Sequence, residues 1–272
     1  MPKTRSPRGS VLRRHEEILQ LLKTQGSVSV NDLAARLHCS RATIRRDLQD
    51  LQESAGLRRF HGAVAVEALA MEGAFQERLA VAAEEKRAIA RAVVAQFNPG
   101  QVVGLNGGTT TTQIAHQIAE AELHVTVVTN AINIAFELAA SSASVVVVGG
   151  VLGPANYETT GPLAIRVLAN LHLDWAVLGA NGVDPRFGAS THTEPEAAVG
   201  QALARQADRV VIAVDHSKLG KTALFRMVDW ADVAAVVCDP RGSDTLAQWG
   251  LGAKLGNDRD ARFWQVRVRT DA

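Results

Sequence analysis

The sequence predicts an α/β protein of two domains, with a small N-terminal unit of helices and a β-hairpin joined to a larger unit built on a mostly parallel sheet. Its 272 residues exceed the roughly 250 at which single cores stop growing. Apolar residues make up 47% of the chain, enough for packed cores. After about residue 83 the pattern changes to short strands that alternate with helices.

The charge is divided unevenly along the chain. Residues 1–65 carry 12 basic and 6 acidic side chains, whereas residues 66–272 carry 17 and 22. A basic segment joined to an acidic body is typical of a module that binds polyanions, although a solvated basic surface has the same balance.

Composition also limits the compartment and the cofactors. No apolar run is long enough to span a bilayer, and the basic start lacks the apolar stretch of a signal peptide, so we expect a cytoplasmic protein. The two cysteines, Cys39 and Cys238, are expected to be reduced. They form no CxxC-type spacing, so the sequence predicts no metal site and no cofactor.

The N-terminal unit begins with an expected disordered arm over residues 1–10, which are rich in Pro, Ser, Gly and basic residues. Apolar residues at helical spacing predict a first helix over 13–24, which Gly26 is expected to end, and a second over 30–37. Ser29 or Asn31 is expected to cap the second helix.

A third helix is predicted to start at Ser40, its N-cap, and to stop before Gly56. Ile44, Leu48 and Leu51 recur at i, i+4 and i+7, so they form one apolar stripe that faces the first two helices.

The opposite face of the third helix carries arginines and a threonine. Arginine can bond a guanine edge with two donors or pair with phosphate, and a threonine methyl can contact thymine. Residues 57–66 have strand-like composition around a glycine turn, which predicts a β-wing that contacts backbone phosphate. Together these features predict a winged helix-turn-helix that binds double-stranded DNA. The candidate DNA-binding residues are Ser40, Arg41, Ala42, Thr43, Arg45, Arg46, Arg58, Arg59 and His61.

Asp47 is interpreted as a structural anchor of the third helix rather than a base reader. Its neighbours at i−4 and i−3 are Thr43 and Ile44, so any arginine partner must come from another element.

Residues 67–83 are interpreted as a linker, which places the DNA-binding domain at 1–66 and the larger domain at 84–272. In the larger domain, strands are predicted over 101–105, 124–128, 145–148, 175–178, 210–214 and 233–238. Helices are predicted near 84–96, 110–121, 132–140, 163–171, 196–207 and 244–249. Short strands separated by helices indicate a mostly parallel sheet covered on both faces.

A Gly-Thr-rich segment over 104–112 lies where the first of these strands gives way to a helix. Gly107 and Gly108 let the backbone approach an anion, and the first helical N–H groups point outward at the positive end of the helix dipole. No Gly-Lys-Ser/Thr follows, so this is not a Walker P-loop. Such a turn also occurs for packing alone.

Polar residues follow three further strands, at 129–130, 179–182 and 215–218. Ligands of open α/β sheets bind at the carboxyl ends of strands, so these groups are expected to converge. Lys218 can supply a cation for a phosphate, although Lys218 taken alone is better interpreted as an ordinary loop lysine.

The stretch from Leu37 to Leu48, Leu-His-Cys-Ser-Arg-Ala-Thr-Ile-Arg-Arg-Asp-Leu, carries a family signature. With Leu51, Gly56, Leu57, Arg59, His61 and Gly62 it resembles the DeoR family of bacterial sugar-metabolism regulators. Ala63 stands where the family usually has Gly, and Cys39 where it often has Val.

The resemblance extends over nearly the whole chain and implies an effector domain similar to ribose-5-phosphate isomerase. It matches the phosphate loop at 107–110, a Thr-Asn pair, a Gly-Pro at Gly161, the Glu at 196 and an Asp-x-Ser-Lys at 215–218. An acidic residue often stands where this chain has Asn106. With the other strand ends, the candidate effector-binding residues are Asn106, Gly107, Gly108, Thr109, Thr110, Thr129, Asn130, Gly161, Asn181, Gly182, Glu196, Asp215 and Lys218.

Two functions are compared. The first is a transcription regulator, a repressor of a carbohydrate-metabolism operon controlled by a phosphorylated sugar. The alternative is a sugar-phosphate isomerase-like enzyme that carries a DNA-binding module. An isomerase needs a base over the sugar carbon, for which Glu196 and Asp215 are candidates, but Asn106 cannot act as a base. The regulator is therefore favoured. One helix-turn-helix reads only a half-site, so a homo-oligomer, a dimer or tetramer, is expected.

Overall fold

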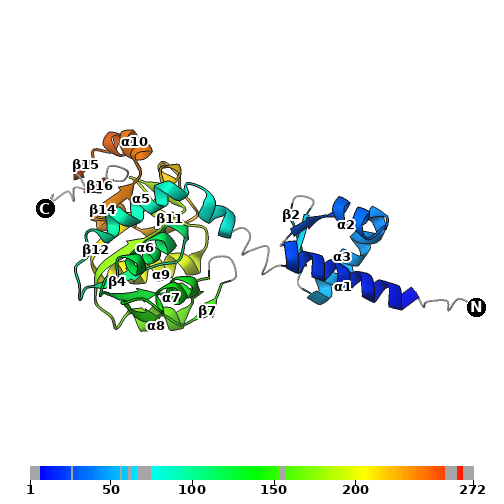
Figure 1. The fold of residues 1–272 in the computed structure, drawn as a ribbon. Coiled ribbons are helices and arrows are strands. Elements are labelled where there is room, and N and C mark those ends of the chain that lie inside the picture. Colours follow the sequence, from blue (N-terminus) through cyan, green and yellow to red (C-terminus); the bar gives the residue numbers. More distant parts are fainter. Residues whose placement is uncertain are drawn as a thin grey trace, which may run out of the picture. The chain divides into compact units, whose positions relative to one another are not determined.

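The structure, a computed structural model, describes residues 7–25, 27–55, 57–60, 63–66, 75–153, 157–254 and 262–265. The chain divides into two compact units, Met1–Glu77 and Arg78–Ala272, with the helical unit first and the α/β unit second (Figure 1). Residues 67–74 of the predicted linker lie outside the described residues, and a helix over 75–80 follows them. The boundaries at 66 and 84 stay predictions.

The first unit contains three helices and a three-stranded antiparallel sheet in the order β1-β3-β2. The elements are α1 (Pro7–Gln25), β1 (Ser27–Ser29), α2 (Val30–Arg36), α3 (Arg41–Ala55), β2 (Leu57–Phe60) and β3 (Ala63–Val66). The predicted helices and wing are confirmed. The strand β1 was not predicted, because three residues are too few to show a strand period.

The start of α1 corrects one expectation. The helix begins at Pro7, so the predicted disordered arm over 1–10 is wrong for residues 7–10. Proline is tolerated in the first turn because its missing N–H would have no helical partner there, and the helix can extend back from its packed part. Gly26, predicted to end this helix, lies outside the described residues.

The caps and the core of this unit agree with the sequence. Ser29 caps α2, since its hydroxyl accepts from Asp32 N at 3.0 Å, and Ser40 accepts from Thr43 N at 3.1 Å. The stripe of α3 is buried. The core of the unit consists of Ile18, Val28, Leu33, Ile44, Leu48 and Leu51.

The second unit is built on an eight-stranded sheet in the order β15-β16-β14-β12-β9-β4-β5-β6. Six neighbouring strands are parallel, and they are the six that the sequence predicts: β4 (Val102–Leu105), β5 (Thr126–Thr129), β6 (Ser144–Val147), β9 (Leu173–Leu178), β12 (Ala207–Ala213) and β14 (Ala235–Cys238). The antiparallel strands β15 (Gly252–Lys254) and β16 (Arg262–Gln265) extend one edge.

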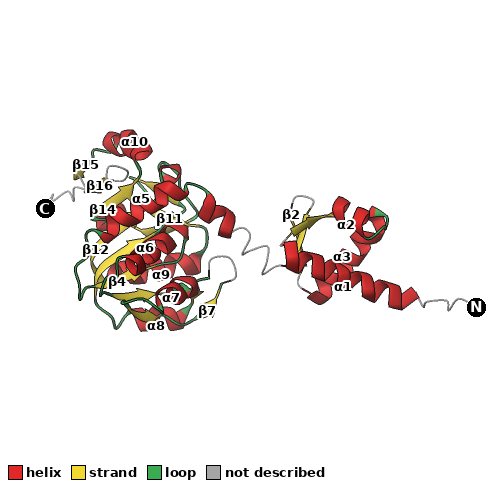
Figure 2. Cartoon of the chain, viewed as in Figure 1, coloured by secondary structure: helices red, strands yellow, loops and turns green. Residues whose placement is uncertain are grey.

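Helices cover both faces of this sheet (Figure 2). One face packs on α5 (Ala83–Val94), α6 (Thr109–Glu120) and α7 (Ile132–Leu138), and the other on α8 (Pro162–Leu168), α9 (Glu194–Arg205) and α10 (Ser243–Gln248). Successive residues of one strand serve opposite faces: Val211 belongs to the first core and Ile212 to the second. All six helices were predicted, with boundaries within two residues except at the C-terminal end of α8.

Two small sheets were not predicted. One has the order β10 (Gly182–Asp184), β11 (Gly188–Thr191), β13 (Phe225–Val228), and the other pairs β7 (Val151–Leu152) with β8 (Thr159–Thr160). The β7–β8 hairpin returns to the carboxyl end of β5, where Thr159 N donates to Asn130 O at 2.7 Å. It thereby adds a wall to the predicted ligand site.

Candidate functional site

The exposed face of α3 carries the predicted DNA-reading residues. Arg41, Ala42, Arg45 and Arg46 are exposed, whereas Thr43 is half-buried. The Thr43 hydroxyl lies 2.9 Å from the Ser40 hydroxyl, within the helix cap. The three exposed arginines give this face of α3 a basic surface. Ser40 and Thr43 also fix the start of the helix.

Asp47 is held from another element, as predicted. The Arg14 guanidinium of α1 donates from Nε to Asp47 Oδ2 at 2.5 Å and from Nη2 to Oδ1 at 2.8 Å, and His15 Nε2 lies 3.3 Å from Oδ1. The hydrogen bond to Asp47 raises the pKa of Arg14 above its usual value. Asp47 is only 3% exposed, so this bidentate pair clamps α1 onto the back of α3.

The wing residues can be placed only on the backbone. Arg58 and Arg59 lie in β2, opposite Ala65 and Val64 of β3. His61 lies outside the described residues. Phosphate contacts by Arg58, Arg59 and His61 stay predictions.

In the second unit, parallel pairing places the carboxyl ends of β4, β5, β9 and β12 on one edge, as predicted. Asn106, just after β4, joins two of these ends. Its Nδ2 donates to Gly179 O at 3.0 Å, and its Oδ1 accepts from Gly179 N at 2.8 Å. Both sides of the amide are engaged with backbone, so Asn106 fixes the spacing of the strand ends at the site.

The predicted phosphate loop leads directly into α6. Gly108, the residue before the helix, has φ of 138°, a conformation that favours glycine. The hydroxyls of Thr111 and Thr112 donate to Gly108 O at 3.1 and 2.7 Å. Gly107 N donates to the carboxylate of Glu158, at 2.6 Å from Oε1. The loop therefore binds an anionic group in this structure, and Glu158 was not among the predicted residues.

The predicted Thr-Asn pair closes the end of β5. Thr129 Oγ1 accepts from Ala131 N at 3.0 Å, and Asn130 Nδ2 donates to Thr159 O at 3.0 Å. Asn130 is 1% exposed, and its Oδ1 has no hydrogen-bond partner among the described groups. Asn133, on α7, is in the same position: Nδ2 donates to Thr112 Oγ1 at 2.9 Å, and its buried Oδ1 is likewise unmatched within the described structure.

Two orphaned amide oxygens beside one loop require an explanation, since a buried acceptor without a donor is costly. Register pairs Leu105 with Thr129, so Asn106 and Asn130 follow adjacent strands. Asn133 contacts the first turn of α6 through Thr112. The residues that carry the orphaned acceptors therefore lie on elements that adjoin the anion loop, at the same edge of the sheet.

Asp215 and Lys218, which follow β12, lie close enough to Lys86 of α5 to interact with its charge. Asp215 is buried, and its Oδ1 accepts from Ser217 N at 3.0 Å, at the start of η1 (His216–Lys218). Lys86 of α5, which the sequence analysis missed, is 3% exposed and donates to Val81 O at 2.6 Å and to Arg78 O. Burial lowers the pKa of the Lys86 ammonium, Asp215 opposes this shift, and Lys218 adds to it. Lys86, Asp215 and Lys218 thus form one electrostatic group.

Asn181 and Glu196 are brought together by Thr191 of β11. The Thr191 hydroxyl lies 2.8 Å from Asn181 Oδ1 and 2.6 Å from Glu196 Oε2. A Cβ on Gly182 would lie 2.4 Å from Lys221 O, so glycine is required there by packing. Gly161 precedes α8 with φ of 98° and has open space around its Cα.

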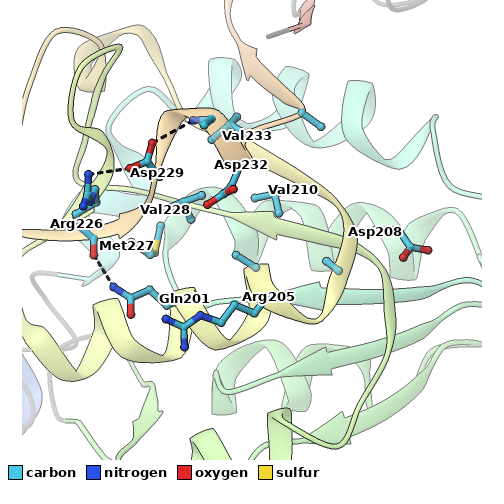
Figure 3. Close-up of a pocket in the computed structure, with 14 residues that line it drawn as sticks. Gln201, Arg205, Asp208, Val210, Arg226, Met227, Val228, Asp229, Asp232 and Val233 are labelled. Carbon is cyan, nitrogen blue, oxygen red and sulfur yellow. Dashed lines mark hydrogen bonds and ion pairs between the residues drawn. The ribbon is translucent and has the colours of Figure 1, made fainter. Parts of the chain in front are cut away.

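A hollow of about 530 Å³ lies elsewhere in the second unit (Figure 3). It is lined by α9, β13, the amino-terminal part of β12 and the segment from Asp229 to Ala234 that precedes β14, and by none of the predicted site residues. Two contacts join polar groups of its lining: Arg226 Nη1 lies 2.8 Å from Asp229 Oδ2, and Gln201 Nε2 donates to Arg226 O at 2.9 Å. Ligands of parallel sheets bind at carboxyl ends, so this hollow is not the predicted site.

Three further observations bear on the predictions. Cys39 and Cys238 are both free, and burial raises the pKa of the Cys238 thiol. Among the described residues, no group of three or more His, Cys, Asp or Glu side chains could hold a metal ion. No described helix has the length and apolar character of a membrane span.

Comparison with protein families decides the identity of both units. Residues 14–68 match the DeoR-like helix-turn-helix domain, and residues 81–240 match the DeoR C terminal sensor domain. The chain belongs to the DeoR family. This DeoR-family protein is a DNA-binding transcriptional regulator, so the predicted class is confirmed and the enzyme alternative is set aside.

Named relatives of this DeoR-family protein are regulators. The putative aga operon transcriptional repressor of Escherichia coli O157:H7 is 33% identical over 230 residues, 83% of this chain and 85% of that protein. The glycerol-3-phosphate regulon repressor of E. coli K12 is 31% identical over 227 residues, 83% and 90% of the two chains. A match to the structure of a ribose 5-phosphate isomerase from Methanocaldococcus jannaschii covers 70% of this chain and 82% of that chain, at 17% identity and with a TM-score of 0.39.

Proposed function

We propose that this regulator represses a carbohydrate-metabolism operon in the cytoplasm and that a phosphorylated sugar, bound at the carboxyl edge of the sheet, controls its affinity for the operator. Two relatives are named as repressors, of the aga operon and of the glycerol-3-phosphate regulon. The observation that carries the effector proposal is the pairing of an anion-binding loop at Gly107 with the orphaned buried acceptor Asn130 Oδ1.

The chemistry of this region suits a sugar phosphate better than it suits an inorganic anion or a neutral sugar. The loop and the positive end of α6 favour a phosphate. Asn130 Oδ1 and Asn133 Oδ1 are hydrogen-bond acceptors, so they need donors, which sugar hydroxyls provide. An inorganic anion would leave both oxygens unsatisfied, and a neutral sugar would not use the loop.

The first experiment is fluorescence anisotropy of the purified protein on DNA from upstream of its own gene cluster, at stated salt, with and without a panel of sugar phosphates. We expect selective binding that one sugar phosphate shifts without being consumed. Selective binding that no member of the panel changes would refute the effector proposal, and turnover of a sugar phosphate would refute binding without catalysis.

Replacing Arg46 by alanine should weaken operator binding by about 1–3 kcal/mol, because an exposed α3 arginine that contacts DNA is lost. Anisotropy on operator and on unrelated DNA measures the change. Arg13→Ala is the matched control, since Arg13 lies exposed on α1 and pairs with Glu17. Equal operator affinities for Arg46→Ala and the unsubstituted protein would remove Arg46 from the interface.

Lys218→Ala should weaken binding of the effective sugar phosphate by about 1.5–3 kcal/mol, the value of a hydrogen bond to a charged group, and leave operator affinity unchanged without effector. Titration calorimetry measures the first quantity and anisotropy the second. Lys221→Ala removes a nearby exposed lysine as the control. A normal ligand affinity in Lys218→Ala would exclude Lys218 from the phosphate site.

We also propose that the regulator is a homodimer formed through an apolar surface around the edge strand β6. Of the exposed large apolar side chains among the described residues, most lie on α7, β6, β7 and α8. Helix α7 contacts β6, and β8 contacts both β7 and α8; Figure 1 shows α7, α8 and β7 in the same part of the second unit. This β6 surface consists of Ile132, Phe136, Val146, Val147, Val151, Leu152, Leu163 and Val167.

The exposure of the β6 surface supports a second copy as its partner. The eight side chains are 36% to 84% exposed. Monomeric proteins rarely expose large contiguous apolar patches, and such patches mark sites of protein–protein contact. A two-fold dimer would also place two helix-turn-helix units on two half-sites.

A further inference from the structure

The carboxylate of Glu158 lies on the phosphate loop itself. Glu158 is 6% exposed, and its Oε1 accepts from Gly107 N at 2.6 Å. A Cβ on Gly107 would lie 2.2 Å from Glu158 Cγ. Gly107 does not have a positive φ, so its backbone conformation does not require glycine. A larger side chain at this position would collide with Glu158 instead.

The backbone on either side of Glu158 is tied to the same edge of the sheet. Glu158 O accepts from Gly153 N at 2.7 Å, across the β7–β8 hairpin, and Tyr157 O accepts from Ile132 N at 2.9 Å, at the start of α7. Tyr157 has φ of 58°, in the left-handed region that non-glycine residues occupy at a cost. The hairpin therefore holds the carboxylate over the loop through a strained residue.

We propose that Glu158 is an internal competitor for the effector site: its carboxylate occupies the position of the effector phosphate, and the phosphate binds by expelling it. This inference rests on the proposed function. One N–H at Gly107 cannot serve both anions, and two anions at one helix terminus repel each other. An anion therefore binds only if its interaction with the loop is strong enough to displace the Glu158 carboxylate.

This requirement has a consequence for specificity. A phosphate dianion carries more charge to the end of α6 than a single carboxylate does, so it displaces Glu158 more readily than a sugar acid of the same size. Displacement also moves the carboxylate away from the loop, so the β7–β8 hairpin must change its contacts when the site fills.

The test uses inorganic phosphate as the probe, titrated calorimetrically at constant ionic strength into the full chain. Glu158→Gln and Glu158→Ala should bind it about tenfold more tightly, which is the effect expected if the competitor fills the site nine tenths of the time. Glu120→Gln removes the same charge from the opposite end of α6 and should bind as the unsubstituted protein does. Unchanged or weaker binding by both Glu158 variants overturns the proposal.

A second readout follows the hairpin directly. The chain has a single tyrosine, Tyr157, so 3-fluorotyrosine labelling gives one ¹⁹F resonance beside Glu158. Phosphate should shift this resonance in the unsubstituted protein, and Glu158→Gln should show a displaced resonance before phosphate is added. If phosphate binds with no shift and the variants gain no affinity, the competitor proposal fails while the effector site stands. If neither phosphate nor any sugar phosphate binds to the protein or the variants, the proposed effector site itself fails.

Discussion

Replacing Asp47 by alanine is expected to destabilise the DNA-binding unit by about 3–5 kcal/mol, the cost of breaking a buried ion pair from one side. The substitution leaves the Arg14 guanidinium, whose side chain is 17% exposed, without the carboxylate that takes two of its donors. A unit of fewer than 80 residues has a small stability reserve, so we expect a large unfolded fraction at 37 °C and loss of operator binding.

Urea unfolding followed by circular dichroism measures this effect, because the two units should give separate transitions. Asp50→Ala, at an exposed position on the same helix, is the control. Replacing both partners, as Arg14→Met with Asp47→Leu, should recover much of the stability, since no uncompensated charge remains. An Asp47→Ala protein with a normal first transition would contradict the role of the pair as a clamp.

Patterns within single elements were enough to predict most of the fold. The spacing of Ile44, Leu48 and Leu51 specified the buried face of α3, and the alternation of apolar strands and helices specified six parallel strands. Parallel strands in turn require a common carboxyl edge, so the convergence of Asn106 and Asn130 could be predicted without any distance. The prediction that Asp47 pairs with another element followed from its own helix, which has no arginine at i−3 or i−4 to pair with it.

Other parts of the site could not be predicted because they depend on contacts between distant segments. Glu158 approaches Gly107 across 51 positions of the sequence, from a hairpin whose strands have two residues each. Lys86 lies in register with Ile89 and Val93 on the buried face of α5, so its place in the apolar stripe was a local signal, but its carbonyl partners were not. The orphaned oxygens of Asn130 and Asn133 exist only in the packed structure.

The β7–β8 hairpin belongs both to the proposed effector site and to the proposed dimer surface. It carries Glu158 at the effector site, and it also carries Val151 and Leu152, which are 73% and 54% exposed and belong to the β6 surface. If effector binding moves the hairpin, it changes the surface that a second copy covers. Effector and dimer partner would then be linked thermodynamically, because each favours one arrangement of the same hairpin.

Replacing Phe136 by glutamate is expected to lower operator affinity about 10²–10⁴-fold, the avidity lost when two half-site contacts become independent. Phe136 is 84% exposed, so the charge should leave the fold of one chain intact while it prevents burial of the β6 surface against a second copy. Sedimentation equilibrium should show a monomer, and anisotropy on a single half-site should be unchanged. Leu224→Glu, at a position that is 76% exposed and outside the β6 surface, is the matched control and should remain dimeric. A Phe136→Glu protein that stays dimeric and binds the full operator normally would show that the second copy docks elsewhere.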